Sequence, residues 1–159
     1  MNDRQQIRRA LESAATVAVV GCSPNPARPS HAIARYLQSQ GYRVVPVNPG
    51  HRELLGEPCF PSLSDVPPDV RIDIVDVFRR SEHVAALAAE AIARGVPFFF
   101  MQQGVVDGPS ARRLEGAGIG VAMDRCILVE HQNLEIEAKS RNVAAPAGVS
   151  PMSRSGTKV

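Results

Sequence analysis

Polar residues with chemistry suited to an anionic ligand directly follow the first apolar run of this 159-residue sequence, Thr16–Gly21. Ser23, Arg28 and Ser30 could supply two hydroxyl groups and a cation. Unpaired N–H groups and the helix dipole favour phosphate where such a loop enters a helix. The loop lacks the GxGxxG motif of dinucleotide sites, because Gly21 is its only glycine. It therefore predicts a phosphate contact, with an ordinary strand-to-helix connection as the alternative.

Val47, Asn48 and Pro49 end the second apolar run and differ from the same point in an NAD-binding domain. Such domains usually place Asp or Glu there to hold the ribose hydroxyl groups. The first carboxylate here is Glu53, several residues further on. The sequence thus lacks both the glycines and the acid that an NAD site requires.

Phe78, Arg79 and Arg80 follow the third apolar run and could bind a nucleotide. Two guanidinium groups can neutralise phosphate, and Phe78 or an arginine plane can stack on a purine. A solvated pair of charges before a helix is the alternative. After the fourth run comes the loop Gln102–Gln103–Gly104, whose glutamine side chains could bind a ribose or an amide, or only cap the loop.

Cys22 is a candidate reactive thiol, because it lies beside Arg28 near a predicted helix N-terminus, where the pKa of a thiol falls. We expect that Cys22 could form a mixed disulfide with a thiol ligand. The alternative is a small residue packed within the loop. Cys22, Cys59 and Cys126 are odd in number and form no CxxC pair, which argues against a disulfide framework and a zinc site.

No catalytic or metal site is predicted. Ser23 lacks the GxSxG motif of a nucleophilic serine. The C-x₃-E-H pattern of Cys126, Glu130 and His131 offers too few ligands for a metal, so a structural polar role is preferred. Asp73 and Asp76 lie three apart in one predicted strand and would point to opposite faces.

The elements that must position these residues alternate between strand-like and helix-like patterns. Ser30 and Ser81 are predicted to cap two helices, and Pro109 to open a third. A short edge strand is expected near Cys59–Phe60, before a brief helix at Ser62–Asp65. The predicted strands are 16–21, 43–47, 71–78, 96–101 and 118–123, and the last helix is predicted at 126–139. This alternation predicts one α/β domain: a Rossmann-like, doubly wound, mostly parallel sheet with helices on both faces.

Composition narrows the class of protein. Hydrophobic residues make up 44% of the chain and aromatic residues 4%, which suits a buried parallel sheet of aliphatic strands. The formal net charge of +2 and the absence of a dense basic block argue against nucleic-acid binding. No long apolar span or signal-peptide pattern is present, so we expect a cytoplasmic protein without membrane contact. The expected boundaries are an N-terminal helix at 1–14, the domain at 15–139 and a disordered polar tail at 140–159.

Six motifs in this order resemble the small stand-alone CoA-binding proteins (the YccU-like group), over about 16–134. These proteins are similar to the CoA-binding domain of the succinyl-CoA synthetase α subunit. The motifs are GCSPNPARPS, VVPVNPG, LGEPCFPSL, DIVDVFRRSE, FFFMQQGV and MDRC…EH.

The resemblance implies a Rossmann-like fold that binds coenzyme A (CoA) or a short acyl-CoA through its strand-end loops. It places the phosphates on the loop Gly21–Ser30, where we expect Ser23 and Arg28 to contact them. It places the pantetheine beside Gln103 and Gly104. The adenosine and its phosphates would be flanked by Val47, Asn48, Pro49, Phe78, Arg79 and Arg80.

The leading hypothesis is therefore non-catalytic binding of CoA. The first alternative is a nicotinamide- or other nucleotide-dependent oxidoreductase, which the missing glycines and the missing acid disfavour. The second is a nucleic-acid-binding or scaffolding domain, which the modest charge disfavours. The sequence makes no prediction of oligomeric state.

Overall fold

Five short strands form one parallel sheet in the computed structural model, which describes residues 1–140. The strands are paired in the order β2-β1-β5-β6-β7, with Val17 opposite Val44 on one side of β1 and Ile74 on the other. Their bounds are β1 Thr16–Val20, β2 Arg43–Val47, β5 Ile74–Val77, β6 Phe98–Met101 and β7 Gly120–Met123.

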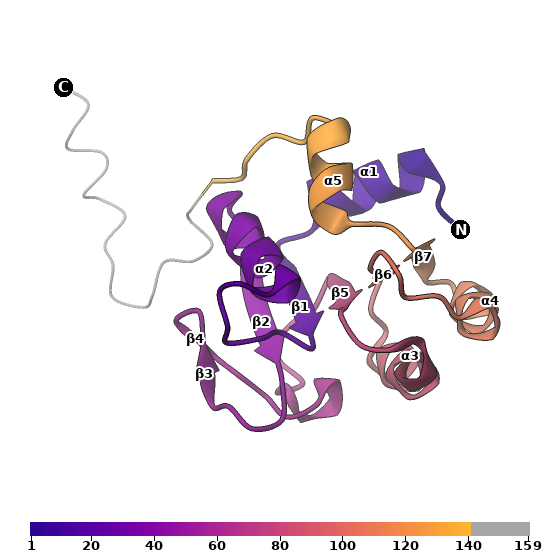
Figure 1. Ribbon diagram of the computed structural model, residues 1–159. Coiled ribbons are helices and arrows are strands. Elements are labelled where there is room, and N and C mark those ends of the chain that lie inside the picture. Colours follow the sequence, from indigo (N-terminus) through magenta and orange to yellow (C-terminus); the bar gives the residue numbers. More distant parts are fainter. Residues whose placement is uncertain (141–159) are drawn as a thin grey trace.

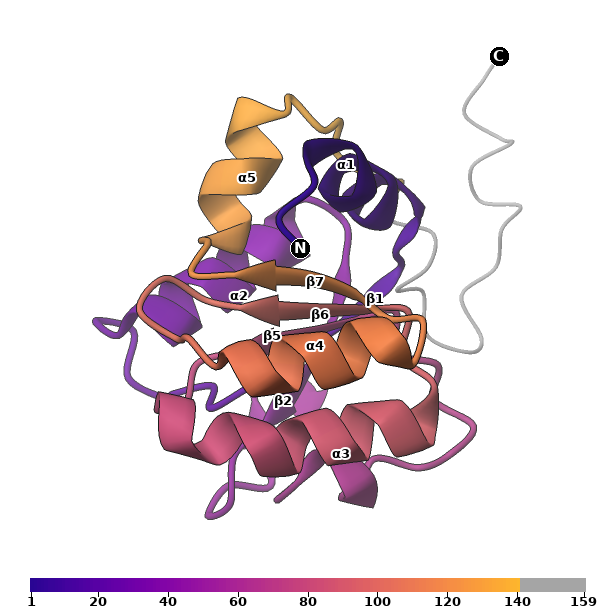
Figure 2. The same ribbon diagram turned by 90° about the vertical axis from the view of Figure 1, so that its right-hand side faces the viewer.

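Helices cover both faces of this sheet (Figures 1 and 2). On one face lie α1 Arg4–Ser13, α2 Pro29–Ser39 and α5 Ile127–Asn133. On the other face lie α3 Val84–Arg94 and α4 Gly108–Gly116. The predicted fold class, a Rossmann-like doubly wound parallel sheet in one α/β domain, is confirmed. None of the helices in the described part of the chain is long and apolar enough to cross a bilayer.

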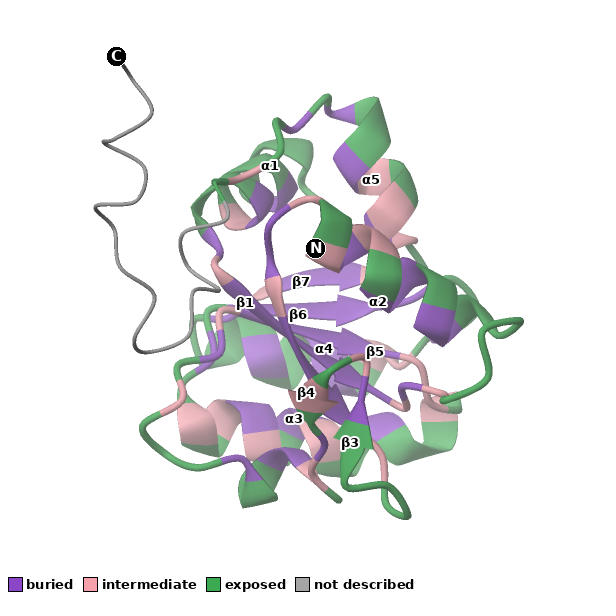
Figure 3. Cartoon of the chain, turned by 90° about the vertical axis from the view of Figure 1, so that its left-hand side faces the viewer, coloured by how far each residue is buried: buried purple, intermediate pink, exposed green. Residues whose placement is uncertain are grey.

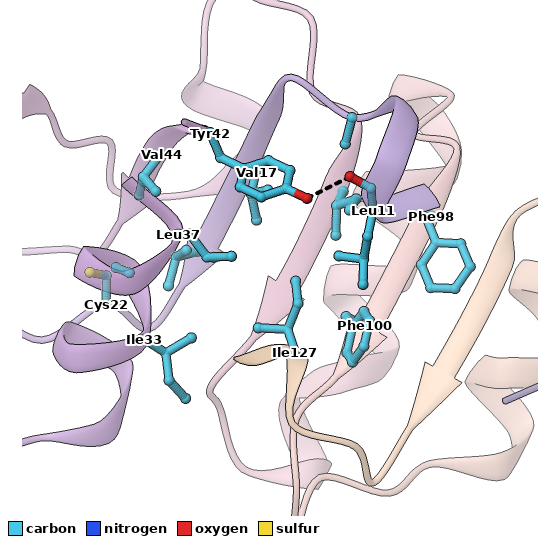
Figure 4. Close-up of a cluster of buried hydrophobic side chains, with 14 of the residues drawn as sticks. Leu11, Val17, Cys22, Ile33, Leu37, Tyr42, Val44, Phe98, Phe100 and Ile127 are labelled. Atoms are coloured by element: carbon cyan, nitrogen blue, oxygen red, sulfur yellow. Dashed lines mark hydrogen bonds between the residues drawn. The ribbon is translucent and has the colours of Figure 1, made fainter. Parts of the chain in front are cut away.

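Alternation along each strand divides the core into two layers, because successive side chains of a strand point to opposite faces. Val17 and Val19 face α1, α2 and α5, whereas Ala18 and Val20 face α3 and α4. The strands are buried along almost their whole length (Figure 3). In the first layer the Tyr42 hydroxyl donates a hydrogen bond to the Leu11 carbonyl, which fixes α1 over the sheet (Figure 4).

Both outer strands of the sheet have additional backbone partners. Beside β7, the Asn2 N–H donates to the Val121 carbonyl at 2.9 Å, and the Asn2 side chain bonds the backbone of Met123. Beside β2, Phe60 forms a parallel bridge with Val47. The intervening chain forms a small hairpin of β3 Glu53–Leu54 and β4 Glu57–Pro58, followed by the short helix η1 Leu63–Asp65.

Several predicted boundaries were wrong. Helix α2 begins at Pro29 after Arg28, and Ser30 lies inside it rather than capping it. Ser81 opens the short helix η2 Ser81–His83 before α3, and its hydroxyl accepts a hydrogen bond from Val106 N–H instead of capping α3. Ser30 bonds Ser23 within its own loop and Ser81 bonds a distant segment, and neither partner is visible in a capping pattern.

Other predicted elements were placed correctly but were too long. The last helix ends at Asn133 rather than at Lys139. The third strand spans only Ile74–Val77, so Asp73 precedes it. A single bridge at Phe60 stands where an edge strand over Cys59–Phe60 was expected. The predicted tail lies outside the described residues, except for Ser140.

The strand order creates a topological switch point beside β1. The chain moves from β1 outward to β2 and then returns past β1 to β5, so the two crossovers run in opposite directions along the sheet. Ligands of open α/β sheets bind at such a point, in the crevice outside the carboxyl ends of the strands. The residues after β1, β5, β6 and β7 are therefore the place to look for a site.

Candidate functional site

A cavity of about 580 Å³ opens beyond the carboxyl ends of the central strands. Its wall comes from the first turns of α2, the segments that follow β5 and β6, and the residue before α5. The wall combines apolar, amide and cationic side chains. The lining residues are Pro29, Ile33, Phe78, Arg79, Arg80, Gln102, Gln103, Gly104, Val105 and Cys126.

Arg79 and Arg80 give this cavity its charge. Arg79 is half-buried and Arg80 is exposed. Neither guanidinium forms an ion pair with a carboxylate among residues 1–140. The segment that carries them is fixed to the sheet, because Phe78 N–H donates to the Val20 carbonyl at 2.8 Å. The cavity therefore has an uncompensated positive rim, which suits a phosphorylated ligand.

Gly21 lets the loop after β1 lie against this arginine segment. Its φ of +87° belongs to the left-handed region. A Cβ atom at Gly21 would lie 2.4 Å from the Phe78 carbonyl oxygen and 3.0 Å from Cδ of Arg79. Glycine is required here by both its φ angle and the close approach.

The loop Gly21–Ser30 is closed by its own hydrogen bonds. Ser23 N–H donates to Ser30 Oγ at 2.9 Å, and Asn25 N–H donates to Ser23 Oγ at 3.0 Å. The buried His31 donates from Nδ1 to the Ser23 carbonyl at 2.9 Å. Ser23 and Ser30 thus shape the loop rather than line the cavity. Arg28 is exposed at its outer edge, without an ion pair among the described residues.

The predicted segment after β2 supports this loop from behind. The Val47 carbonyl accepts hydrogen bonds from the N–H groups of Gly21 and Cys22, and Asn48 Nδ2 donates to the Cys22 carbonyl at 2.7 Å. Pro49 is exposed. These three predicted residues lie outside the cavity wall, as do Gly21, Ser23, Arg28 and Ser30.

The other predicted residues do come together. Phe78, Arg79, Arg80, Gln103 and Gly104 all line the cavity. Four lining residues were not predicted for the site, Pro29, Ile33, Val105 and Cys126, and Gln102 was considered only as part of its loop. Gln102 and Cys126 were visible in the motifs MQQG and MDRC, but nothing local shows that these motifs meet. Pro29 and Ile33 carry no such signal, because their role depends on which side of α2 faces the sheet.

Three hydrogen bonds join the segments after β6 and β7. Gln102 Oε1 accepts from Ile127 N–H at 2.9 Å, and Arg125 N–H donates to the Met101 carbonyl at 3.2 Å. Gly104 N–H donates to Asp124 Oδ1 at 2.7 Å. This network holds the start of α5 against the cavity.

The expected reactivity of Cys22 is wrong. Cys22 is fully buried, and its pKa rises to about 12 because of burial first, with additional effects of Cys59 and Asp76. A buried thiol with a raised pKa is a poor nucleophile. Cys22 instead packs in the first core layer.

Two buried titratable groups lie near the site but outside its wall. Asp76 in β5 is 0% exposed, and neither of its carboxylate oxygens has a hydrogen-bond partner among residues 1–140. His131 in α5 shares a 2.7 Å hydrogen bond between Nδ1 and the Tyr36 hydroxyl, and its buried Nε2 has no partner in the same described part of the chain. The ring also makes edge contacts with Tyr36 and Tyr42, in keeping with the structural role predicted for it.

Comparisons with known proteins found a family model and similar proteins of known sequence or structure. A family model described as a CoA binding domain matches residues 15–132. The uncharacterized protein YneT of Bacillus subtilis is 40% identical over 128 residues, which cover 80% of this chain and 93% of YneT. A solved structure from Thermus thermophilus is 40% identical with a TM-score of 0.78, covering 83% of this chain and 98% of that one.

A larger protein shares part of this sequence. The ADP-forming acetate–CoA ligase I of Archaeoglobus fulgidus is 39% identical over 61 residues, which are 38% of this chain and 9% of the ligase. The shared part is therefore a small region of a much longer enzyme.

Proposed function

The chain belongs to the CoA-binding domain family, and from that premise we propose that it binds coenzyme A or a short acyl-CoA in the cavity at the carboxyl ends of the strands. The proposal is for binding alone, without a reaction of its own.

The observation that carries this proposal is a pair of arginines on the rim of a largely apolar cavity that form no ion pair within the described residues. CoA joins a strongly anionic nucleotide to a long neutral arm with two amides. A guanidinium pair suits the phosphates of such a molecule, and an apolar wall with a few polar groups suits its arm. Arg79 and Arg80 supply the first property, and Ile33, Val105 and Gln103 supply the second.

The loop after β1 would contribute to the same site from the side. Its backbone amides at Gly21, Cys22, Ser23, Asn25 and Arg28 are already bonded within the protein. A phosphate contact there would therefore fall to the Arg28 side chain rather than to an open nest of N–H groups. Asn48 would act through the loop that it holds, beside the adenosine.

Isothermal titration calorimetry with CoA, acetyl-CoA, ATP and NADH tests the proposal. We expect CoA to bind at least about tenfold more tightly than NADH, a difference of roughly 1.4 kcal/mol. Acetyl-CoA that binds as well as CoA would extend the site to short acyl groups. No heat with CoA at millimolar concentration would overturn the proposal, and tighter binding of NADH would favour the oxidoreductase alternative.

A further inference from the structure

Of the three cysteines, which all lie in the described residues, Cys126 alone borders the cavity. Cys22 and Cys59 are buried, whereas Cys126 is half-buried, and all three are free thiols. A ligand in the cavity could therefore approach Cys126 but not the other two. Cys126 is therefore accessible from the cavity, whereas Cys22, which the sequence favoured as the reactive thiol, is buried.

Gln102 places an available amide donor on the same cavity wall as Cys126. The residue is only 4% exposed. Its Oε1 accepts from Ile127 N–H, while its Nε2 forms no hydrogen bond to another described residue. This Nε2 is not sealed in the core, so it can donate to a carbonyl acceptor of a ligand in the cavity.

The protein fixes the position of the Cys126 backbone from both sides. Arg125 N–H before it bonds the Met101 carbonyl, and Ile127 N–H after it bonds Gln102. Cys126 and Gln102 are therefore fixed on the same cavity wall. Phe78, Arg79 and Arg80 supply a separate, cationic part of the wall from the segment after β5.

From this arrangement we propose that Cys126 is a site of reversible covalent attachment of CoA, with Gln102 holding the pantetheine arm. The inference rests on the proposed function and specifies the orientation of the bound CoA. The phosphates lie on Arg79 and Arg80, an amide carbonyl of the arm accepts from Gln102 Nε2, and the terminal sulfur lies at Cys126.

The attachment is a thiol–disulfide exchange with the oxidised form of CoA, its symmetric disulfide. The Cys126 thiol loses its proton, and its sulfur attacks one sulfur of the disulfide. A new S–S bond forms between Cys126 and one CoA as the original S–S bond breaks. The second CoA leaves as a thiolate and takes up the proton, so no further oxidant is consumed. A reducing thiol reverses the step.

Mass spectrometry of the intact protein after exposure to CoA disulfide tests the attachment. We expect a gain of one CoA less two hydrogen atoms, mapped to Cys126 by fragmentation and reversed by dithiothreitol. Cys126→Ser should abolish the gain. An adduct on Cys22 or Cys59, or no adduct at all, would overturn the proposal.

Comparison with glutathione disulfide distinguishes a directed reaction from a merely exposed thiol. At equal concentration, CoA disulfide should modify Cys126 at least about tenfold faster, because binding in the cavity orients the sulfur. Arg79→Ala with Arg80→Ala should reduce this preference. Equal rates with the two disulfides would overturn the inference.

Calorimetry under reducing conditions separates this inference from the proposed function. The wild-type protein should bind CoA under these conditions, in which no disulfide adduct forms. CoA binding there, without any adduct after exposure to CoA disulfide, would reject the attachment while preserving the binding function. Absence of CoA binding would reject both.

Discussion

The Phe78 carbonyl oxygen occupies the space that a side chain on Gly21 would need, at 2.4 Å from the position of its Cβ. These residues follow β1 and β5, the two strands that meet at the switch point. The contact therefore joins the proposed phosphate loop to the arginine segment. A change at Gly21 would displace both.

Gly21→Ala should destabilise the fold by about 2 kcal/mol or more, because backbone strain at positive φ is added to a steric clash. Gly56→Ala is the matched control, since Gly56 also has a positive φ, of +75°, but no atom lies near its Cβ position. Urea unfolding of both variants would measure the difference. Equal losses of stability would show that the approach to Phe78 has no energetic consequence.

Replacing Arg79 and Arg80 together by alanine should weaken CoA binding by a few kcal/mol in total, the scale of hydrogen bonds to charged groups. The rim would lose both cations that lack ion-pair partners. Calorimetry at two salt concentrations should also show a weaker salt dependence. Arg113→Ala, at the far end of α4, serves as the control and should bind CoA as the wild type does. Unchanged affinity in the double variant would remove these arginines from the site.

Asp76→Asn should stabilise the protein at neutral pH. Complete burial raises the pKa of Asp76 well above 3.8, so the folded protein holds a proton that the unfolded chain releases. Stability is therefore lost as the pH rises above the ordinary aspartate range. Urea unfolding between pH 4 and pH 8 should show a growing advantage of the variant, about 1 kcal/mol or more at pH 7. A variant less stable than wild type at pH 7 would contradict this.

Asp73→Asn is an internal comparison, because it should change the stability of the protein in the direction opposite to Asp76→Asn. Burial tends to raise the pKa of Asp73, but hydrogen bonds from Arg71, Ala15 and Thr16 outweigh it and lower that pKa below 3.8. The stability that Asp73 contributes is present at neutral pH and is lost as the pH falls through the folded-state pKa. Asp73→Asn should therefore destabilise the protein at pH 7, where Asp76→Asn stabilises it.

The contribution of His131 to stability should fall as the pH drops below 6.5, opposite in direction to that of Asp76. Burial first, and the charge of Lys139 second, lower the pKa of His131 from 6.5, so the unfolded chain takes up a proton that the folded protein refuses. His131→Phe keeps a ring between Tyr36 and Tyr42 and should flatten this pH dependence. The exposed His51→Ala is the control for unfolding curves at each pH. A parallel decline in wild type and His131→Phe would contradict the assignment.

The fold was predictable because the relevant signals are local and repeated. Aliphatic runs such as Thr16–Val20 alternate with helical patterns, and Gly95 ends α3 in the left-handed conformation as its position predicts. The lengths of the helices and strands were less predictable. The segment after Asn133 has polar and apolar residues that suit a helix, yet Ile136 and Lys139 are fixed to His131 and Gln40 by backbone hydrogen bonds.

Half of the candidate site was visible in the sequence because strand ends in a parallel sheet meet at one edge. On this basis we predicted Phe78, Arg79 and Gln103 as site residues, and all three line the cavity. It could not show that Ser30 would turn back to bond Ser23, or that Cys22 would be buried and Cys126 accessible. Those outcomes depend on how helices α2 and α5 pack across the sheet, which is a tertiary property.

The backbone partners on both outer strands affect how copies of this domain can meet. An open strand edge is a template on which another chain can add a strand and propagate aggregation. Here Asn2 bonds the outer side of β7, while Phe60 bridges β2, whose Pro46 also lacks an N–H to offer. Stacking of neighbouring molecules into a continuous ribbon is thereby disfavoured at both sides, and self-recognition, where it occurs, is left to the helical faces.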